Sequence, residues 1–503
     1  MANSDASSAP LDPRLAAIRN FEGKYPKQLW WLFLSEMWER FCFYGMRGVL
    51  TVFMVEQLLI KEDVASEQYG AIQAFIYAMT FVGGFLADRV LGFRRSIVWG
   101  GLLMAAGSFT IAAAPQHLFY IGTCFTIVGT GFFKPNISGV VGLLYHAGDN
   151  RRDAGFALFY SGINLGAFLG GIVCFELGDR LGWEWAFASA GLVMVIGVAV
   201  FTATKHTLGP LGFSPLIPEG TTASPRARNT LLGVYAGSLL AIPAILLLVT
   251  NPDYTRAFMF AVGPIALIWF ALGMRGCTRE QVNKLIVALV LIVFSIFFWA
   301  FFEQAGTSLA LVARNHLPTE SLAGISITPN SVNNSSNSLF VILFSPLLGL
   351  LWLRMGRHEP GMVVKFAFGF FFVAAGFYVF SRLGSYADAK ALSSLTVFSF
   401  AWFLATVGEL CLSPIGLSAM TKLAPQRMFG IIMGLWFLAS AYGQYFAGLL
   451  SAAMTDTDPN ATPMQKLNSF CEGFGNLAIY AVGFGVALLV LSPVLKKLAK
   501  DQS

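Results

Sequence analysis

Seven charged residues of this chain lie inside long apolar stretches, where no water is expected to solvate them: Glu36, Glu39, Arg40, Arg47, Lys134, Glu303 and Glu409. An ionised side chain at the middle of a membrane costs roughly 2.5–3.5 kcal/mol on insertion scales. Such residues are retained where they pair with one another or line a wet cavity, and they mark paths for ions or charged substrates. The sequence therefore predicts that these seven residues form the functional site.

The first apolar segment carries four of the seven charges and a tyrosine. On a helix turning 100° per residue, its polar side chains share one stripe about 140° wide: Glu36, Glu39, Arg40, Tyr44 and Arg47. Glu36 and Arg40 have the spacing of an (i, i+4) ion pair. One interpretation is a charge-balanced knot that locks two helices. Two acids, two bases and a tyrosine on one stripe favour the wall of a cavity instead.

The composition indicates what kind of element must position these charges. Of 503 residues, 56% are hydrophobic and only 12% are charged, against about 25% charged residues in soluble domains. The apolar runs are continuous over about 20 residues and do not alternate with period two. The chain is therefore predicted to be an all-α membrane protein that crosses the bilayer many times.

Apolar runs between polar breaks predict fourteen spanning helices. Several of them exceed the roughly 20 residues that a bilayer requires, so we expect tilt or protruding ends. The predicted spans are 28–58, 67–88, 95–114, 118–146, 154–178, 184–204, 230–250, 257–274, 283–313, 330–353, 361–382, 393–421, 428–453 and 474–495.

The distribution of Lys and Arg predicts the orientation. With both termini cytoplasmic, roughly three times as many of these residues fall on the cytoplasmic side as on the external side, as the positive-inside rule requires. The net charge of +6 follows from this bias, and we expect no nucleic-acid partner. The six cysteines fall mostly inside apolar runs without paired spacing, so neither a disulfide framework nor a metal site is expected.

The spans divide into groups. Residues 206–229 contain four prolines and predict a cytosolic linker after six spans. The last six spans form a second group, which leaves a hairpin without embedded charge between the groups. The predicted division is a cytosolic tail (1–27), a six-helix bundle (28–205), the linker, an inserted two-helix hairpin (230–275), a second six-helix bundle (276–497) and a cytosolic tail (498–503). Two bundles with a site at the midplane between them are typical of transporters.

A loop between the second and third spans supports this architecture. GGFLADRVLGFRRS (Gly83–Ser96) resembles the loop signature of the major facilitator superfamily, with one additional residue before Gly92. GLLWLRMGR (Gly349–Arg357) is a weaker echo in the second half. The resemblance implies the fold of that superfamily, with this loop acting as a conformational latch and not as a substrate site.

Four further segments carry a closer resemblance. EMWERFCFYG in the first span, GTGFFKPNISGVVG (Gly129–Gly142), FYSGINLGAFLGG (Phe159–Gly171) and VGELCLSPIGLSAMTKLAP (Val407–Pro425) resemble the proton-dependent oligopeptide transporter family. The resemblance runs in order from about Leu29 to Trp436, and the extra hairpin matches bacterial-type members. It implies alternating-access symport of di- and tripeptides with protons across a bacterial inner membrane. The proton gradient would drive transport without a cofactor, and we expect a lipid-embedded monomer.

The same resemblance implies roles for individual residues. Arg40 and Lys134 would hold the peptide carboxylate, and Glu409 would meet its amino terminus. Four side chains would bond the peptide backbone: Tyr44, Tyr77, Asn164 and Asn337. Trp299 and Trp436 would line side-chain pockets. Phe43 replaces a tyrosine, and Ser338 replaces a proline, that are usual in the family.

Proton coupling needs an acid that can gain and lose its proton. The candidates are Glu36 and Glu39 beside Arg40, and Glu303 in FFWAFFEQ. We expect Arg47 to pair with Glu303, and Lys134 with Glu409, across the two halves. Release of either pair would let the bundles rock.

Three other functions are less well supported by the sequence. The same fold could carry nitrate or a small organic anion, which needs the base Lys134 but not the acid Glu409. An intramembrane enzyme is disfavoured, because all five histidines lie at helix ends or in loops and no HExxH or GxSxG motif occurs. A channel or scaffold is disfavoured by the two-bundle division and the charges that could form bridges.

Overall fold

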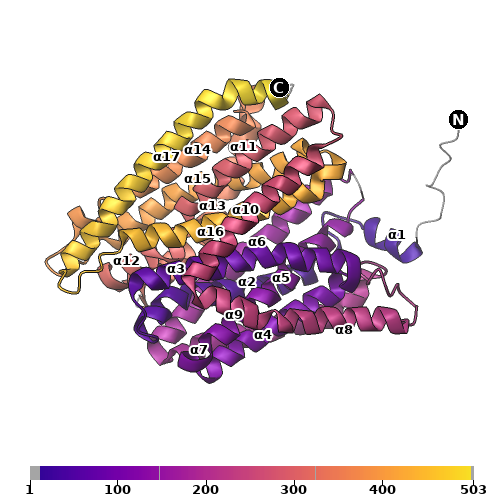
Figure 1. The fold of residues 1–503 in the computed structure, drawn as a ribbon, viewed down its shortest axis with the longest axis horizontal. Coiled ribbons are helices and arrows are strands. Elements are labelled where there is room, and N and C mark those ends of the chain that lie inside the picture. The colour runs from indigo at the N-terminus through magenta and orange to yellow at the C-terminus, as the bar shows by residue number, and fades with distance from the viewer. Residues whose placement is uncertain (1–11, 147, 323–324, 500–503) are drawn as a thin grey trace.

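In the computed structural model, which describes residues 12–146, 148–322 and 325–499, most of the chain is helical (Figure 1). The first half contains α2 (Lys27–Glu56), α3 (Glu62–Leu86), α4 (Phe93–Ala113), α5 (Pro115–Leu143), α6 (Arg151–Leu181) and α7 (Trp183–Thr204). The middle contains α8 (Pro225–Leu240), α9 (Ile242–Thr250) and α10 (Pro252–Met274). The second half contains α11 (Arg279–Phe302), α12 (Ser308–His316), α13 (Pro329–Met355), α14 (Met362–Phe380), α15 (Leu395–Leu423), α16 (Phe429–Met454) and α17 (Pro463–Ala499).

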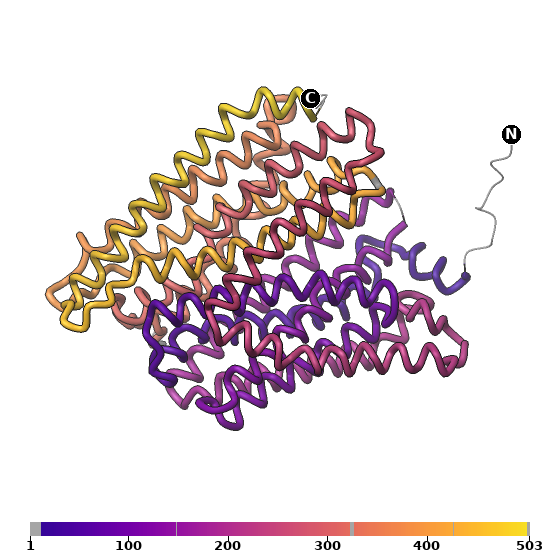
Figure 2. Tube along the Cα trace, viewed as in Figure 1, coloured from indigo at the N-terminus to yellow at the C-terminus, as the bar shows by residue number. Residues whose placement is uncertain are grey.

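Each half has its own apolar core. The buried hydrophobic side chains of α2–α7 form one large cluster, and those of α11–α17 form another. The two halves meet where α3 packs on α16 and α6 packs on α13. Figures 1 and 2 show the indigo and purple half lying against the orange and yellow half. A site between the halves can therefore change shape without disrupting either core.

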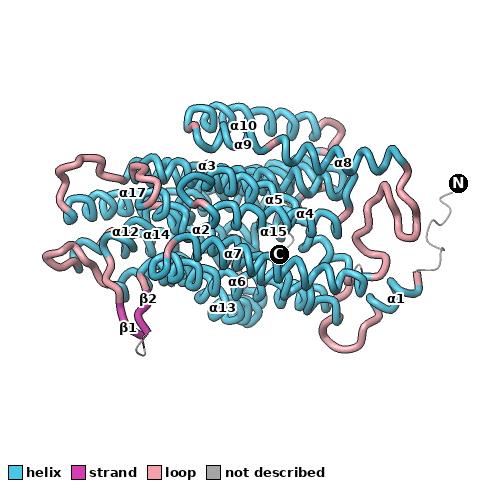
Figure 3. The backbone as a smooth tube through the Cα atoms, turned by 90° about the horizontal axis from the view of Figure 1, so that it is seen from below, coloured by secondary structure: helices cyan, strands magenta, loops and turns pink. Residues whose placement is uncertain are grey.

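Because the long helices run along one direction, the molecule has two ends. We call the end where α11 begins and α15 and α17 finish the terminal face. The opposite end, where α2 finishes and α12 lies, is the distal face. The distal face also carries a short antiparallel pair of strands, β1 (Glu320–Leu322) and β2 (Ile325–Ile327), in a segment predicted to be a loop (Figure 3).

Eleven helices among the described residues are long and apolar enough to cross a membrane. The helices α2, α5 and α16 fall outside this set although each is at least 26 residues long. The embedded charges of α2 lower its hydropathy. The chain is thus an all-α, multi-pass membrane protein, and the count of fourteen spans stays a prediction.

The predicted span 283–313 corresponds to one candidate membrane span, Arg279–His316, but its helix is interrupted at the centre. α11 ends at Phe302, a 3₁₀ turn (η3, Glu303–Gly306) follows, and α12 resumes at Ser308. The Tyr69 hydroxyl lies 1.9 Å from the position that a Cβ on Gly306 would occupy, and Thr51 donates a hydrogen bond to the Gly306 carbonyl. The break therefore depends on contacts with the other half of the molecule, which periodicity does not reveal.

The predicted amino-terminal tail contains a helix, α1 (Pro13–Arg19). Asp12 caps it by accepting a hydrogen bond from the Arg14 amide at 2.9 Å, and Pro13 occupies the first position, where its missing N–H is no loss. Arg14 also binds Glu219 of the linker at 2.7 Å. Residues 1–11 and 500–503 of the predicted tails lie outside the described residues.

The inserted hairpin contacts both halves. Its first arm begins at Pro225, within the predicted linker, and is interrupted at Ala241, so that α8 and α9 share one span. α9 packs on α5 and α3, whereas α10 packs on α16 and α3. In Figure 3 the three helices form one edge of the molecule. Most of their surface is exposed, which agrees with a peripheral position outside the two cores.

The loop signature between α3 and α4 holds the linker on the terminal face. The Arg94 guanidinium donates to the Leu211 carbonyl at 2.6 Å and to the Gly209 carbonyl at 2.5 Å, and lies 4.2 Å from the Phe213 ring centroid. Gly92 has φ of +75°, a backbone conformation that favours glycine. The signature thus ties the first half to the chain that leaves it.

Candidate functional site in the membrane-embedded centre

The charges of the first helix form a buried cluster in α2. The Arg40 Nε lies 2.9 Å from Glu36 Oε1, and Arg40 also forms an ion pair with Glu39. All three side chains are buried. Their spacing on one helical stripe brings them together as the sequence predicted, so each charge has an opposite charge beside it.

The charged groups of this cluster lie close together, but several of their atoms make no hydrogen bond among the described residues. Arg40 Nη2, Glu36 Oε2 and both carboxylate oxygens of Glu39 have no aligned hydrogen-bond partner among the described residues. Buried polar groups without partners are costly. Their presence in the apolar interior indicates groups that bind a proton, water or a ligand, and disfavours a purely structural knot.

Lys134 lies beside this cluster on α5. Its Nζ is 4.4 Å from the Tyr77 ring centroid and 5.9 Å from the Phe43 ring centroid, so both rings contribute cation–π contacts. Arg40 lies 5.4 Å from the same Phe43 ring. Pro135 follows Lys134 inside the helix and removes one backbone donor there. Phe43, which lacks the hydroxyl usual in the family, therefore packs between the two cations.

Arg47 and Glu303 form the predicted ion pair between the halves. Arg47 projects from α2, while Glu303 lies in the 3₁₀ turn where α11 breaks. Arg47 Nε also donates to the Tyr69 hydroxyl at 2.6 Å, and its guanidinium lies 5.6 Å from the Tyr44 ring centroid. The broken helix thus places a carboxylate between the two halves, and broken helices of this kind are found at transporter sites.

The predicted pair of Lys134 with Glu409 is not formed in this conformation. Glu409, on α15, instead accepts a hydrogen bond from Asn337 Nδ2 at 2.7 Å, and Asn337 also donates to Thr406 at 3.3 Å. Lys134 instead lies against the rings of Tyr77 and Phe43. In this conformation Asn337 binds Glu409, and Lys134 lies against the two rings beside the α2 cluster, so the role of this pair as a gate stays a prediction.

A cavity of about 110 Å³ joins these groups at the centre of the molecule. Seven of the predicted site residues line it: Tyr44, Arg47, Tyr77, Trp299, Glu303, Asn337 and Glu409. It draws walls from α2 and α3 of the first half and from α11, η3, α13 and α15 of the second. Charged side chains of both signs from the two halves therefore face one shared cavity.

The remaining predicted residues lie outside the lining of this cavity. Glu36, Glu39, Arg40 and Lys134 form the cluster described above. Asn164 donates to the Tyr160 carbonyl of its own helix at 3.0 Å. Trp436 is buried in the second core, where its ring blocks the space that a Cβ on Gly416 would need.

Sequence reasoning missed several lining residues: Tyr69, Phe302, Asn333, Asn334 and Trp402. Asn333 donates to the Ala305 carbonyl at 2.8 Å and accepts from Trp402 Nε1 at 3.1 Å. A signal was available in the run SVNNSSNS of α13, which is unusually polar for a membrane helix. Ser338 of this run also lines the cavity. The helix α13 is continuous at Ser338, and the proline inside this helix is Pro346.

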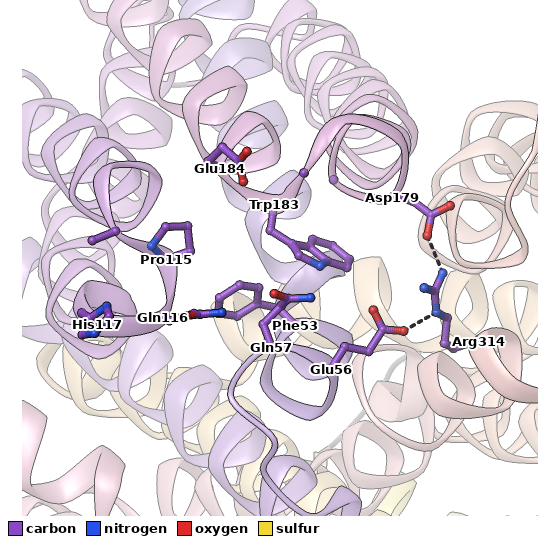
Figure 4. A pocket seen from close by; sticks show the side chains of 13 residues that line it. Phe53, Glu56, Gln57, Pro115, Gln116, His117, Asp179, Trp183, Glu184 and Arg314 are labelled. Carbon is purple, nitrogen blue, oxygen red and sulfur yellow. Dashed lines mark hydrogen bonds and ion pairs between the residues drawn. The ribbon is translucent and has the colours of Figure 1, made fainter.

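Ion pairs and hydrogen bonds join the two halves at the distal face. Figure 4 shows Arg314 of α12 reaching the carboxylates of Glu56 and Asp179, which belong to α2 and α6. Both ion pairs measure 2.5 Å and border an outer pocket of about 530 Å³. Nearby, Glu176 accepts hydrogen bonds from Thr328 and Ser331 of the second half at 2.8–2.9 Å. The two halves are therefore held together distally.

The sequence model of the POT family matches residues 94–210 and 266–467. This chain belongs to the POT family. The peptide transporter YePEPT of Yersinia enterocolitica is 35% identical over 463 residues, covering 86% of this chain and 88% of that protein. The dipeptide and tripeptide permease A of Chromobacterium violaceum is 31% identical over 484 residues, covering 95% of both.

Solved structures of POT family proteins share the whole architecture. The peptide transporter POT in complex with sulfate superposes with a TM-score of 0.82 at 33% identity, covering 97% of this chain and 98% of that one. A POT family transporter in complex with 5-aminolevulinic acid has a TM-score of 0.80 at 28% identity, covering 94% and 97%. This chain is thus a transporter of the major facilitator fold and not an enzyme.

Proposed function

We propose that this POT family chain is a proton-coupled symporter that imports di- and tripeptides by alternating access. The central cavity supports this assignment most strongly, because Arg47 of the first half and the acid Glu409 of the second half both line it. A zwitterionic peptide needs a cationic group at one end and an anionic group at the other. A simple anion needs only the bases.

Peptide recognition would begin at the two charged ends. Arg40 Nη2, which has no partner among the described residues, and Lys134 would take the carboxylate. Glu409 would take the ammonium group, since Asn337 occupies only one of its two oxygens. Tyr44, Tyr77 and Asn337 would bond the peptide backbone. Contacts of this kind do not involve the side chains of the peptide, which favours broad selectivity.

Proton coupling would act through the buried carboxylates. Protonating Glu303 removes the negative charge that holds Arg47, so the link between α2 and η3 weakens when the proton binds. Glu36 and Glu39 would supply a second site for the proton beside Arg40. A proton and a peptide that bind the same conformation more tightly become coupled through that conformation.

Alternating access would exchange one closed end for the other. Arg314 joins the two halves at the distal face in this conformation, so that end would be the closed one. The pair Lys134–Glu409 would form when the terminal face closes, and a peptide carboxylate bound to Lys134 would release it. The terminal face would be cytoplasmic, with both chain termini there, as the distribution of Lys and Arg favours. The chain would act as a monomer in a bacterial inner membrane.

Uptake of a labelled dipeptide into proteoliposomes tests the proposal. An inward pH gradient should drive accumulation of dialanine, and unlabelled trialanine should compete with it. The same vesicles should acidify when the peptide is added. If dialanine neither accumulates nor carries protons while nitrate or a small organic anion does, the alternative solute is correct. 5-Aminolevulinic acid belongs among the competitors, because it also carries an amine and a carboxylate.

A further inference from the structure

A second cavity, separate from the central one, opens among the helices of the second half at the terminal face. It encloses about 700 Å³ between α13, α14 and α15, with contributions from the first turns of α11 and the last residue of α17. Its inner wall is apolar and includes Leu348, Leu410 and Ile415. Proposed peptide and proton sites use none of these residues.

The mouth of this cavity is basic. Three lysines line it, Lys284 of α11, Lys365 of α14 and Lys422 of α15, against one acid, Glu359. A fourth lysine is close, because Lys496 Nζ lies 3.4 Å from the position that a Cβ on Gly361 would occupy. Helices far apart in the sequence therefore converge with the same charge.

One of these lysines is buried and held in place. Lys365 forms an ion pair with Glu359, and its Nζ lies 4.7 Å from the Trp352 ring centroid. Its side chain is only 9% exposed. The Glu359 charge is thus already engaged, so it does not neutralise the other lysines. The aromatic ring adds a rigid wall to the mouth.

The other lining lysines keep charge available. Lys284 contacts Glu280 at 3.3 Å in a solvated pair, which contributes little. Lys422 is exposed and has no ion-pair partner within the described part of the chain. A basic surface on this face alone follows from membrane orientation. A cavity that combines lysines with an apolar wall is a more specific feature than a basic surface, since it matches a ligand in which an anionic group is attached to an apolar body.

We propose that this cavity binds a phosphate-bearing anion, with the phosphate between Lys284 and Lys422 and the rest of the ligand along the apolar wall. Lysine ammonium groups bind phosphate as compact point charges. Basic pockets between membrane helices take the head groups of anionic lipids. The phosphate has two sources, an anionic phospholipid of the surrounding bilayer or a soluble phosphate.

Native mass spectrometry of the delipidated, full-length protein tests the site. The ligands are 1-palmitoyl-2-oleoyl-phosphatidylglycerol, the corresponding phosphatidylcholine and inorganic phosphate. The double variant Lys284→Gln/Lys422→Gln removes the two charges proposed to bind the phosphate, and Ser418→Trp fills the cavity without changing charge. A matched control, Lys24→Gln/Lys27→Gln, removes two exposed lysines of the first half. Monodisperse size-exclusion profiles and unchanged dipeptide uptake establish that each variant folds.

The proposal expects phosphatidylglycerol to bind the wild-type protein and the control equally. Its apparent dissociation constant should rise about tenfold or more in the double variant and in Ser418→Trp. Displacement of the lipid by inorganic phosphate would identify soluble phosphate as a sufficient ligand, whereas resistance to displacement would identify the lipid. Equal binding of phosphatidylglycerol and inorganic phosphate by all variants, or an equal loss in the control, would overturn the site.

Discussion

At the scale of single residues, the pair of Arg47 and Glu303 explains how a proton can control a conformation. A buried ion pair gains little over apolar packing, but removing one partner costs about 3–5 kcal/mol because it leaves an uncompensated charge. Protonation of Glu303 has the same effect as removing that partner. Because the two residues come from different halves, the cost falls on the interface and not on either core.

Glu303→Gln should separate transport from proton coupling. The amide keeps the size of the side chain but neither titrates nor balances Arg47. We expect pH-driven dialanine uptake to fall by about tenfold or more, while counterflow between equal peptide pools persists. Both assays use the same proteoliposomes. Glu320→Gln, an exposed acid on β1, is the control. Full proton-driven uptake by Glu303→Gln would remove this residue from the mechanism.

Glu409→Gln should abolish the preference for a free amino terminus. Wild-type protein should bind dialanine about tenfold or more tightly than N-acetyl-dialanine, since acetylation removes the ammonium charge. In the variant, the two peptides should bind alike, because the partner charge is gone. Competition against labelled peptide gives the four affinities, and their double-mutant cycle isolates the pairwise energy. A pairwise energy of zero in this cycle would show that Glu409 does not bind the ammonium group of the peptide.

The residue types and their spacing were sufficient to identify the charges of the site but not all their partners. Periodicity placed Glu36, Glu39 and Arg40 on one stripe, and the structure brings them together. It did not reveal Tyr69, whose hydroxyl contacts Arg47, because tyrosine is ordinary in an apolar helix. It also did not reveal that Asn337 occupies Glu409, since that contact depends on how α13 and α15 pack.

At the scale of elements, the close packing of α3 on α5 depends on one glycine of a pair. A Cβ on Gly83 would lie 2.1 Å from the Gly131 carbonyl oxygen, a distance at which the backbone must shift. A Cβ on Gly84 would lie 3.6 Å from Pro135, which is ordinary contact. The two neighbours therefore differ in what they tolerate, although the sequence motif contains both.

Gly83→Ala should destabilise the protein while Gly84→Ala should not. The first substitution forces two backbones apart, and overpacking of this kind costs about 1–3 kcal/mol. We expect a lower melting temperature in detergent and less monodisperse protein for Gly83→Ala. Gly84→Ala serves as the matched control, because it adds the same methyl group one residue away. Equal stability of both variants would show that the helices adjust more freely than their packing indicates.

At the scale of the whole molecule, the two halves are joined by contacts from the central cavity to the distal face. Arg314 is prominent there because it binds two helices of the other half at once. Each partly exposed ion pair contributes about 0–1 kcal/mol, so the two together contribute at most about 2 kcal/mol. A contribution of this size shifts a conformational equilibrium without locking it.

Arg314→Gln should increase the population of molecules open at the distal face. Nitroxide labels at Gln116 and Glu320, one on each half, report the opening by electron–electron double resonance. The labelling background carries Cys277→Ser, because the other five cysteines are buried. We expect a longer distance component in the variant. Arg382→Gln, whose side chain binds Tyr378 of its own half, should leave the distances unchanged. Identical distributions in both variants would contradict a latch at Arg314.

The sequence by itself determined the class of the protein, because hydropathy, embedded charge and motif spacing are properties of single segments. Length and apolarity predict spanning helices, and one helical stripe predicts the charge cluster of α2. The embedded charges also predicted the Arg47–Glu303 pair, which the structure contains. Tertiary structure decided the rest: the turn that presents Glu303, the neutral partner of Glu409 and the Arg314 latch all depend on segments far apart in the chain. Their geometry depends on how two halves pack, and a one-dimensional pattern carries no record of that.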